Sequence, residues 1–199
     1  MPPEKYKSSQ YTKNKIMKTA ISVFNEHGSA SISLNMLAAE IGISTGNLQY
    51  HYQNKEEIIR AILEIMFNDW NTVYQEMHVP TFSLDSLRTV LEINFKLVWK
   101  YRFFYRELNA LLLKDELLAK RFAIIQEQRL TEQEMLMKQI NRSKQARSVK
   151  KSELRSIVTI GWIISNSWLS YIESTGKPID EHAMKAGVDI LVDHYKPYL

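Results

Sequence analysis

The 199-residue chain contains no cysteine, so it can form neither a disulfide nor a thiolate zinc site. No apolar run approaches the roughly 20 residues that a membrane-spanning helix needs. The first ten residues are polar and basic and lack the apolar stretch of a signal peptide. We therefore expect a cytoplasmic protein with no membrane segment.

Motifs typical of enzymes are also missing. The sequence has no Gly-rich phosphate loop, no nucleophile motif and none of the Glu-x-x-His pairs that build a di-metal site in a helical bundle. His182, Asp189 and Asp193 fall near one helix face and could hold a metal, but a solvated surface is the simpler interpretation. We expect no catalytic residue, no metal and no cofactor, and a metal-dependent helical-bundle enzyme stays an alternative.

Composition and charge are those of an ordinary globular protein. Hydrophobic residues make up 45% of the chain and charged residues 24%, and the formal net charge is +4. Positive charge is concentrated in residues 138–160. Such a run usually covers a solvated loop or helix face, and we interpret it in this way rather than as a nucleic-acid patch.

Apolar residues recur at the helical period along nearly the whole chain, and strand-like alternation is absent. The pattern predicts an all-α fold in which two short helices, capped by Ser33 and Ser44, lie between longer ones. The longer helices are expected at about Lys13–His27, from Asn54 to a break at residues 78–80, and at about Leu84–Tyr101, Phe103–Leu113, Asp115–Asn141, Ser152–Thr175 and Asp180–Tyr195. We place a domain boundary inside the fourth helix, between residues 1–63 and 64–199.

The segment ISTGNLQYHYQNKEE, from Ile43 to Glu57, contains two helix starts so close together that the helix between them has only about two turns. So short a helix is not stable alone, because it buries too little apolar surface. The residues around it supply neighbours: small and apolar positions in the preceding helix, a glycine at the turn and Leu48 facing inward. This spacing indicates a helix-turn-helix, in which one helix presents the next to the major groove of DNA.

The outward face of the short helix carries side chains suited to DNA. Asn47 and Gln49 can pair bidentately with adenine, and a tyrosine hydroxyl commonly binds a phosphate oxygen. Gly46 permits close approach of the duplex, and Lys55 in the next helix would add a phosphate contact. The alternative is that some of these side chains, such as His51, only pack against the protein.

These residues also resemble a known family. ISTGNLQYHYQNKEEI, preceded by KIMKTAISVFNEHG, is similar to the N-terminal DNA-binding domain of the TetR family of bacterial transcription regulators. The resemblance implies a helical homodimer that binds a near-palindromic, double-stranded operator, with a C-terminal domain for ligand binding and dimerisation and repression usually relieved by a small molecule. With the helix cap Ser44, the predicted DNA-binding residues are Ser33, Ser44, Thr45, Gly46, Asn47, Gln49, Tyr50, His51 and Lys55.

Three positions depart from the family pattern. Ile32 replaces the usual threonine, Asn35 stands where arginine is common, and Gln49 replaces a frequent tyrosine, so that a phosphate contact could move to Tyr50. The base preference of relatives therefore does not carry over.

The last two helices are expected to form the dimer interface. Apolar residues point nearly all round the segment Val158–Ile172, which requires burial on more than one side. The last helix has a face of small and apolar residues suited to close helix packing, around Ala183, Ala186 and Gly187. The resemblance places the interface here, although an intramolecular core would explain either helix alone.

A small-molecule site is expected among the aromatic residues of the C-terminal part. Such sites are mostly apolar and carry a few polar groups. The pattern favours an apolar or aromatic effector over a highly charged one. The candidates are Trp70, Tyr74, Trp99, Phe103, Phe104, Trp162, Asn166 and Trp168. A protein-interaction adaptor is the other alternative, but it would not need a polar recognition helix.

Overall fold

The computed structural model describes residues 4–76, 83–143 and 150–198, leaving aside the side chains of residues 4–8, 74–76, 139–143 and 151. The described residues are almost entirely helical, as the sequence predicted. The helices are α1 (Glu4–His27), α2 (Leu34–Ile41), α3 (Thr45–His51), α4 (Lys55–Glu76), α5 (Leu84–Lys100), α6 (Arg102–Lys114), α7 (Glu116–Ser143), α8 (Lys151–Ser174) and α9 (Glu181–Tyr195), followed by a short 3-10 helix (Lys196–Tyr198).

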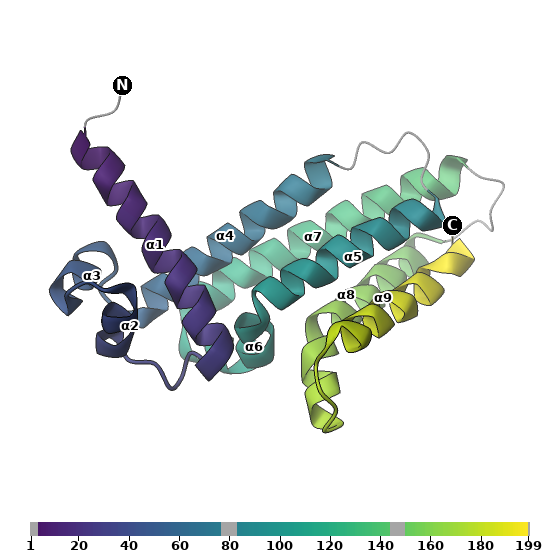
Figure 1. Ribbon diagram of the computed structural model, residues 1–199. Coiled ribbons are helices and arrows are strands. Elements are labelled where there is room, and N and C mark those ends of the chain that lie inside the picture. Colours follow the sequence, from purple (N-terminus) through teal and green to yellow (C-terminus); the bar gives the residue numbers. More distant parts are fainter. Residues whose placement is uncertain (1–3, 77–82, 144–149, 199) are drawn as a thin grey trace.

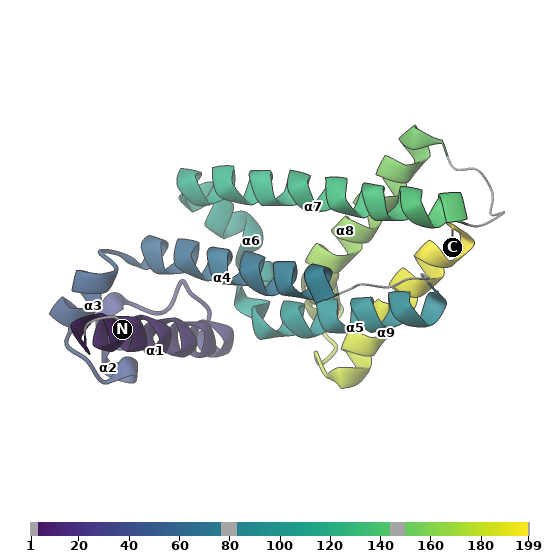
Figure 2. The same cartoon turned by 90° about the horizontal axis from the view of Figure 1, so that it is seen from above.

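The helices form an elongated molecule. Helices α1 to α3 and the start of α4 lie at one end, α4, α5 and α7 run along its length, and α8 and α9 lie at the other end (Figure 1). The view from above shows the same separation of α3 from α8 and α9 (Figure 2). The predicted helix-turn-helix and the predicted dimer surface are therefore far apart.

Helix ends follow local capping signals. The Ser33 and Ser44 hydroxyls accept hydrogen bonds from the backbone N–H groups of Met36 and Asn47, at 3.2 and 3.1 Å. Both predicted caps are therefore confirmed, and Asn54, where the next helix was predicted to start, accepts with its Oδ1 from the N–H of Glu57 at 2.9 Å. The Glu57 carboxylate in turn accepts from the N–H of Gln53.

The start of α1 was predicted wrongly. The helix begins at Glu4 instead of near Lys13, and Ile16 is its first fully buried residue. Hydrophobic periodicity reports only the part of a helix that packs against something. Among the extra residues whose side chains the structure describes, residues 9–12 are exposed or only partly buried, so the pattern could not reveal them.

Two hydrophobic clusters make up the core. The first extends from the N-terminal helices into α6 and α7 and contains Ile16, Leu48, Ile62 and Phe104; the second joins α5, α7, α8 and α9. Because the first cluster crosses residue 63, the helix-turn-helix and the bundle share one core. The division into 1–63 and 64–199 stays a prediction about function.

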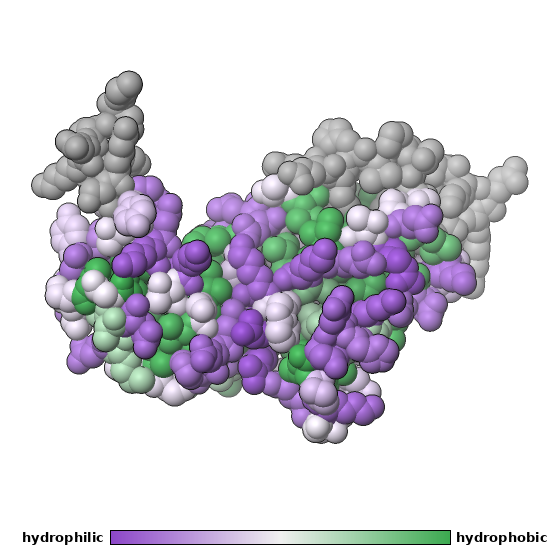
Figure 3. Space-filling view, in the orientation of Figure 1, coloured by the Kyte–Doolittle hydropathy of each residue, from purple (hydrophilic) through white to green (hydrophobic). Residues whose placement is uncertain are grey.

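The surface is mainly polar on the face shown in Figure 3, where hydrophobic residues appear as separate patches. Within the described residues, no helix has both the length and the apolar character needed to cross a membrane.

Candidate nucleic-acid interface and internal cavity

The turn between α2 and α3 has the geometry of a helix-turn-helix. Gly42 lies in the left-handed region at φ 76° and ψ 38°, and its N–H donates to the carbonyls of Ala38 and Ala39 at 3.0 Å. A residue with a Cβ would be strained in this conformation. The tight turn brings Leu48 of α3 onto the core, where it is 0% exposed.

The other face of α3 is open. Gly46, Asn47, Gln49 and Tyr50 are exposed, and Tyr50 is 80% exposed. A Cβ added at Gly46 would meet no atom within 4 Å. The exposed Tyr50 ring leaves apolar surface in contact with water, and a partner bound to this face would bury it.

The remaining predicted residues of α3 are partly held by the protein. Thr45 Oγ1 donates to Asn35 Oδ1 of α2 at 3.0 Å, which links the two helices at their solvent-facing side. His51 is half-buried and lies edge-on to Tyr50, with ring centroids 5.2 Å apart. No sequence pattern indicated the hydrogen bond between Asn35 and Thr45.

Lys55 has partners inside the protein. Its ammonium group donates to the backbone carbonyls of Ser29 at 2.5 Å and Ile32 at 2.8 Å, in the loop between α1 and α2. Burial, followed by the positive charge of Lys114, lowers the pKa of this ammonium group. Lys55 therefore positions the loop that leads into the helix-turn-helix, and its phosphate contact stays a prediction.

Polar contacts tie the N-terminal helices to the bundle. Asn25 of α1 is buried and binds the break between α5 and α6 with both ends of its amide: Nδ2 donates to the carbonyl of Lys100 at 2.9 Å, and Oδ1 accepts from the N–H of Phe103 at 3.0 Å. Further along, Arg121 of α7 binds Glu64 of α4 through two nitrogens at 2.6 and 2.7 Å. A movement of α5, α6 or α7 would therefore displace α1 and α4 or break these hydrogen bonds.

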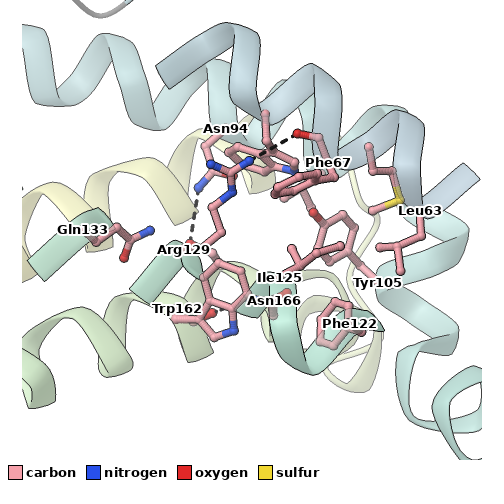
Figure 4. A pocket seen from close by; sticks show the side chains of 14 residues that line it. Leu63, Phe67, Asn94, Tyr105, Phe122, Ile125, Arg129, Gln133, Trp162 and Asn166 are labelled. Carbon is pink, nitrogen blue, oxygen red and sulfur yellow. Dashed lines mark hydrogen bonds between the residues drawn. The ribbon is translucent and has the colours of Figure 1, made fainter. Parts of the chain in front are cut away.

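An internal cavity of about 50 Å³ lies between α4, α5, α6, α7 and α8 (Figure 4). This volume holds a few water molecules, so an organic ligand would have to push the walls apart. The cavity is lined by Leu63, Met66, Phe67, Trp70, Asn94, Val98, Tyr105, Phe122, Ile125, Arg129, Gln133, Trp162, Ser165 and Asn166.

The structure brings three of the predicted ligand residues together at this cavity: Trp70, Trp162 and Asn166. The side chain of Tyr74 lies outside the described residues. The other four are placed elsewhere, since Phe103, Phe104 and Trp168 pack in the core while Trp99 is 40% exposed on the surface. Trp168 also donates from its indole nitrogen to the carbonyl of Ala183 at 3.0 Å, which fixes it between α8 and α9.

Apart from Asn166, sequence reasoning missed the polar residues of the cavity wall. Asn94, Arg129 and Gln133 occupy positions where the apolar pattern of α5 and α7 faces inward, between residues such as Leu91 and Val98. They could have been identified as polar side chains at helical positions where the periodic pattern calls for an apolar residue.

Gly187 has a different role from the one predicted. A Cβ on Gly187 would lie 2.4 Å from Cε1 of Phe95 and 2.8 Å from Cε2 of Trp168, both in the same chain. The small residue therefore permits packing of α9 within the protomer. The exposed apolar residues of the last two helices are Ile160, Ile163 and Tyr171 on α8 and Ile190 on α9.

The predicted acidic and histidine face of α9 forms no metal centre. Asp189 is paired with Arg88 of α5 at 2.5 Å. Among the residues that the structure describes, no group of three or more His, Cys, Asp and Glu side chains could hold a metal ion.

Two family models match most of the chain. Residues 16–62 match the model of the bacterial regulatory proteins of the tetR family, and residues 66–199 match a TetR model described as a bacterial transcriptional repressor. Both descriptions are of regulators rather than enzymes.

Curated relatives and solved structures are similar to parts or all of the chain. The negative transcriptional regulator IcaR of the biofilm operon icaADBC, from Staphylococcus epidermidis, is 36% identical over 75 residues, which are 38% of this chain and 40% of the relative. An HTH-type transcriptional regulator of Staphylococcus aureus is 29% identical over 89 residues, 41% of this chain and 48% of the relative. The chain thus matches less than half the length of these curated relatives.

The fold is shared over almost the full length with solved regulators. A TetR-family transcriptional regulator from Marinobacter aquaeolei has a TM-score of 0.82 and 24% identity, covering 94% of this chain and 90% of that one. AibR, solved with isovaleryl coenzyme A and operator DNA, has a TM-score of 0.68 and 16% identity, covering 91% and 98%. With both family models matched in order, the chain belongs to the TetR family of bacterial transcription regulators.

Proposed function

We propose that this protein is a transcriptional repressor that binds a near-palindromic DNA operator as a homodimer and releases it when a small molecule binds. The observation that carries the proposal is that α3 is buried on one side and exposed on the other. Leu48 is fully buried, while Gly46, Asn47, Gln49 and Tyr50 are exposed on the opposite side. A helix fixed on one side and polar on the other can enter the major groove with its donors and acceptors already positioned.

The proposed DNA contacts divide into two roles. Asn47 and Gln49 would read base edges, while Tyr50 and the hydroxyls of Ser33 and Ser44 would donate to phosphates. The Thr45 hydroxyl would bind a phosphate by turning its proton away from Asn35. The proposed role of His51 is a further polar contact at the end of α3, and that of Gly46 is to let the duplex approach closely.

Dimerisation is proposed through α8 and α9. Ile160, Ile163, Tyr171 and Ile190 leave an apolar face exposed on these two helices. A second copy would cover this face and place two α3 helices on DNA related by a two-fold axis.

The effector is proposed to bind the cavity next to Trp70. Helix α4 forms one wall of this cavity and begins at Lys55, beside the helix-turn-helix. A single helix therefore connects the two regions, and a ligand that prefers one position of α4 would change DNA affinity.

The test is selection of bound duplexes from a random DNA pool, followed by affinity measurements at several salt concentrations. We expect a recovered site with two-fold symmetry, bound more tightly than random DNA. Binding without any sequence preference, or no DNA binding together with a stable protein partner, would refute the proposal and favour an adaptor.

A further inference from the structure

Arg129 is a buried cation in the cavity wall. Its side chain is 3% exposed, and among the described residues that line the cavity it is the only charged one. Its guanidinium group lies 4.8 Å from the centre of the Phe67 ring, and Figure 4 shows it beside Asn94 at the apolar space. A buried charge of this kind requires an opposite charge or several hydrogen bonds.

Among the described residues, Arg129 has hydrogen-bond partners on α7 and on α4. Nη1 binds the carboxylate of Glu132, one turn further along α7, at 2.6 Å. Nη2 donates to Asn71 Oδ1 at 2.6 Å and to the carbonyl of Phe67 at 3.2 Å, both on α4. Arg129 is thus both a wall of the cavity and a direct link between α7 and α4.

The ion pair between Arg129 and Glu132 is the contact of Arg129 that can open most easily. The side chain of Glu132 is 34% exposed, so water can hydrate its carboxylate if the ion pair opens. The guanidinium group of Arg129 is buried, so water cannot hydrate it in the same way if the ion pair opens. An anionic group inside the cavity would be a more deeply buried counter-ion than Glu132, in surroundings where charge-assisted hydrogen bonds are strong.

We propose that the effector is an amphipathic organic anion, with an apolar body that enters the cavity and a carboxylate or similar group that binds Arg129 in place of Glu132. This inference rests on the proposed function of the cavity and specifies its ligand. The body would contact the rings and aliphatic chains of the wall, such as Phe67, Phe122 and Ile125. The sequence alone favours an apolar or aromatic effector over a highly charged one, because it does not show that Arg129 faces the cavity.

The same exchange would act on α4. A guanidinium group that turns toward a ligand anion can no longer keep its present geometry to Asn71 and Phe67. Helix α4 would lose a contact to α7 at its C-terminal half while its N-terminal half still holds the loop before the helix-turn-helix through Lys55. Binding of the anion would therefore change the position of α4, and with it the affinity for operator DNA.

The experiment compares three probes of equal length: octanoate, octanamide and octylamine, with carboxylates from butanoate to dodecanoate to vary the body. Dissociation constants are measured by calorimetry on the full chain. We expect the best carboxylate to bind about tenfold or more tightly than its amide, and the amine not to bind. Equal affinity for acid and amide, or no saturable binding of any carboxylate, would overturn the proposal.

Three variants locate the effect. Arg129→Gln should remove the preference for the acid, whereas Arg121→Gln should keep it, because Arg121 lies 5.1 Å from the same Phe67 ring but does not line the cavity. Glu132→Gln removes the competing anion from a partly exposed position, so it should tighten acid binding and leave amide binding unchanged. If Arg129→Gln fails to fold, the Glu132→Gln result decides, and an unchanged acid affinity there contradicts the exchange.

Operator binding is measured on the same preparations. Sequence-specific DNA binding without a preference for the acid would remove only the inference about the effector. Absence of specific DNA binding would remove the proposed function itself, whichever probe binds.

Discussion

Glu107 of α6 accepts hydrogen bonds from both the backbone N–H and the hydroxyl of Ser29, in the loop between α1 and α2, with the N–H bond at 2.8 Å. The carbonyl of Ser29 in turn accepts from Lys55 at the start of α4. One loop residue therefore joins the bundle to the helix-turn-helix. A movement of the bundle relative to the helix-turn-helix would have to carry the Glu107–Ser29 contact with it or break it.

Replacing Glu107 should destabilise the protein. Ser29 is 2% exposed, so in Glu107→Ala its N–H would be left buried without this partner. We expect the free energy of unfolding to fall by about 1–3 kcal/mol in urea denaturation. Glu26→Ala is the matched control, since the Glu26 side chain is 70% exposed, and an equal loss in both variants would contradict the role of Glu107.

Variants of the exposed face of α3 should separate base contacts from phosphate contacts. Asn47→Ala and Gln49→Ala should each lose about 1–3 kcal/mol of affinity for the selected site, if each binds a base bidentately, and little for random DNA. Tyr50→Phe should lower the affinity for the selected site and for random DNA by the same factor. Anisotropy titrations at several salt concentrations check this, and equal losses on both DNAs for all three variants would refute the division of roles.

Lys55→Ala should have two effects. Weaker binding to every sequence and a smaller salt dependence would reveal a phosphate contact. A lower thermal stability would reveal the lost hydrogen bonds to Ser29 and Ile32. Lys177→Ala, an exposed lysine between α8 and α9, controls for removal of a positive charge. A stability loss with unchanged DNA binding would leave Lys55 with its structural role alone.

The proposed dimer predicts opposite outcomes for two variants. Ile163→Glu changes a side chain that is 56% exposed, so sedimentation should show a folded monomer with weakened operator binding. Gly187→Leu should instead destabilise the protomer by about 1–3 kcal/mol, because Phe95 and Trp168 already fill the space. Leu117→Glu, 61% exposed on α7, is the control, and dissociation by this variant as well would count against α8 and α9 as the interface.

The contact of Glu64 with Arg121 should give a measurable pH dependence. The hydrogen bond from Arg121 lowers the pKa of Glu64 below its ordinary value of 4.5. The ionised carboxylate is therefore favoured by folding, and its contribution is present above pH 4.5 and lost as the pH falls through the lower pKa of the folded state. The stability difference between wild type and Glu64→Gln should be largest near neutral pH and shrink in acid. A difference that is constant across this range would exclude the ion pair as its source.

The starts of α2, α3 and α4 and the inward face of α3 were set by the sequence, because their causes are local. A serine or asparagine hydrogen-bonds to a backbone N–H three residues later, and an apolar residue at the helical period faces inward whatever it meets. Ser33, Ser44, Asn54 and Leu48 were therefore assigned correctly. The family was recognisable for the same reason, since its motif is a continuous stretch of chain.

Only the tertiary structure decided which side chains share a cavity. Phe103 and Phe104 have the same periodic signature as cavity residues, yet they meet Phe24 and Phe122 in the core, because the break at Tyr101 turns α6 toward α1. The guanidinium group of Arg129 is buried because α4 packs against α7 and supplies two of its hydrogen-bond acceptors. Periodicity gives the direction of a side chain from its own helix. What lies in that direction depends on helices distant in sequence, and their packing determined the cavity wall, the partners of Lys55 and the space around Gly187.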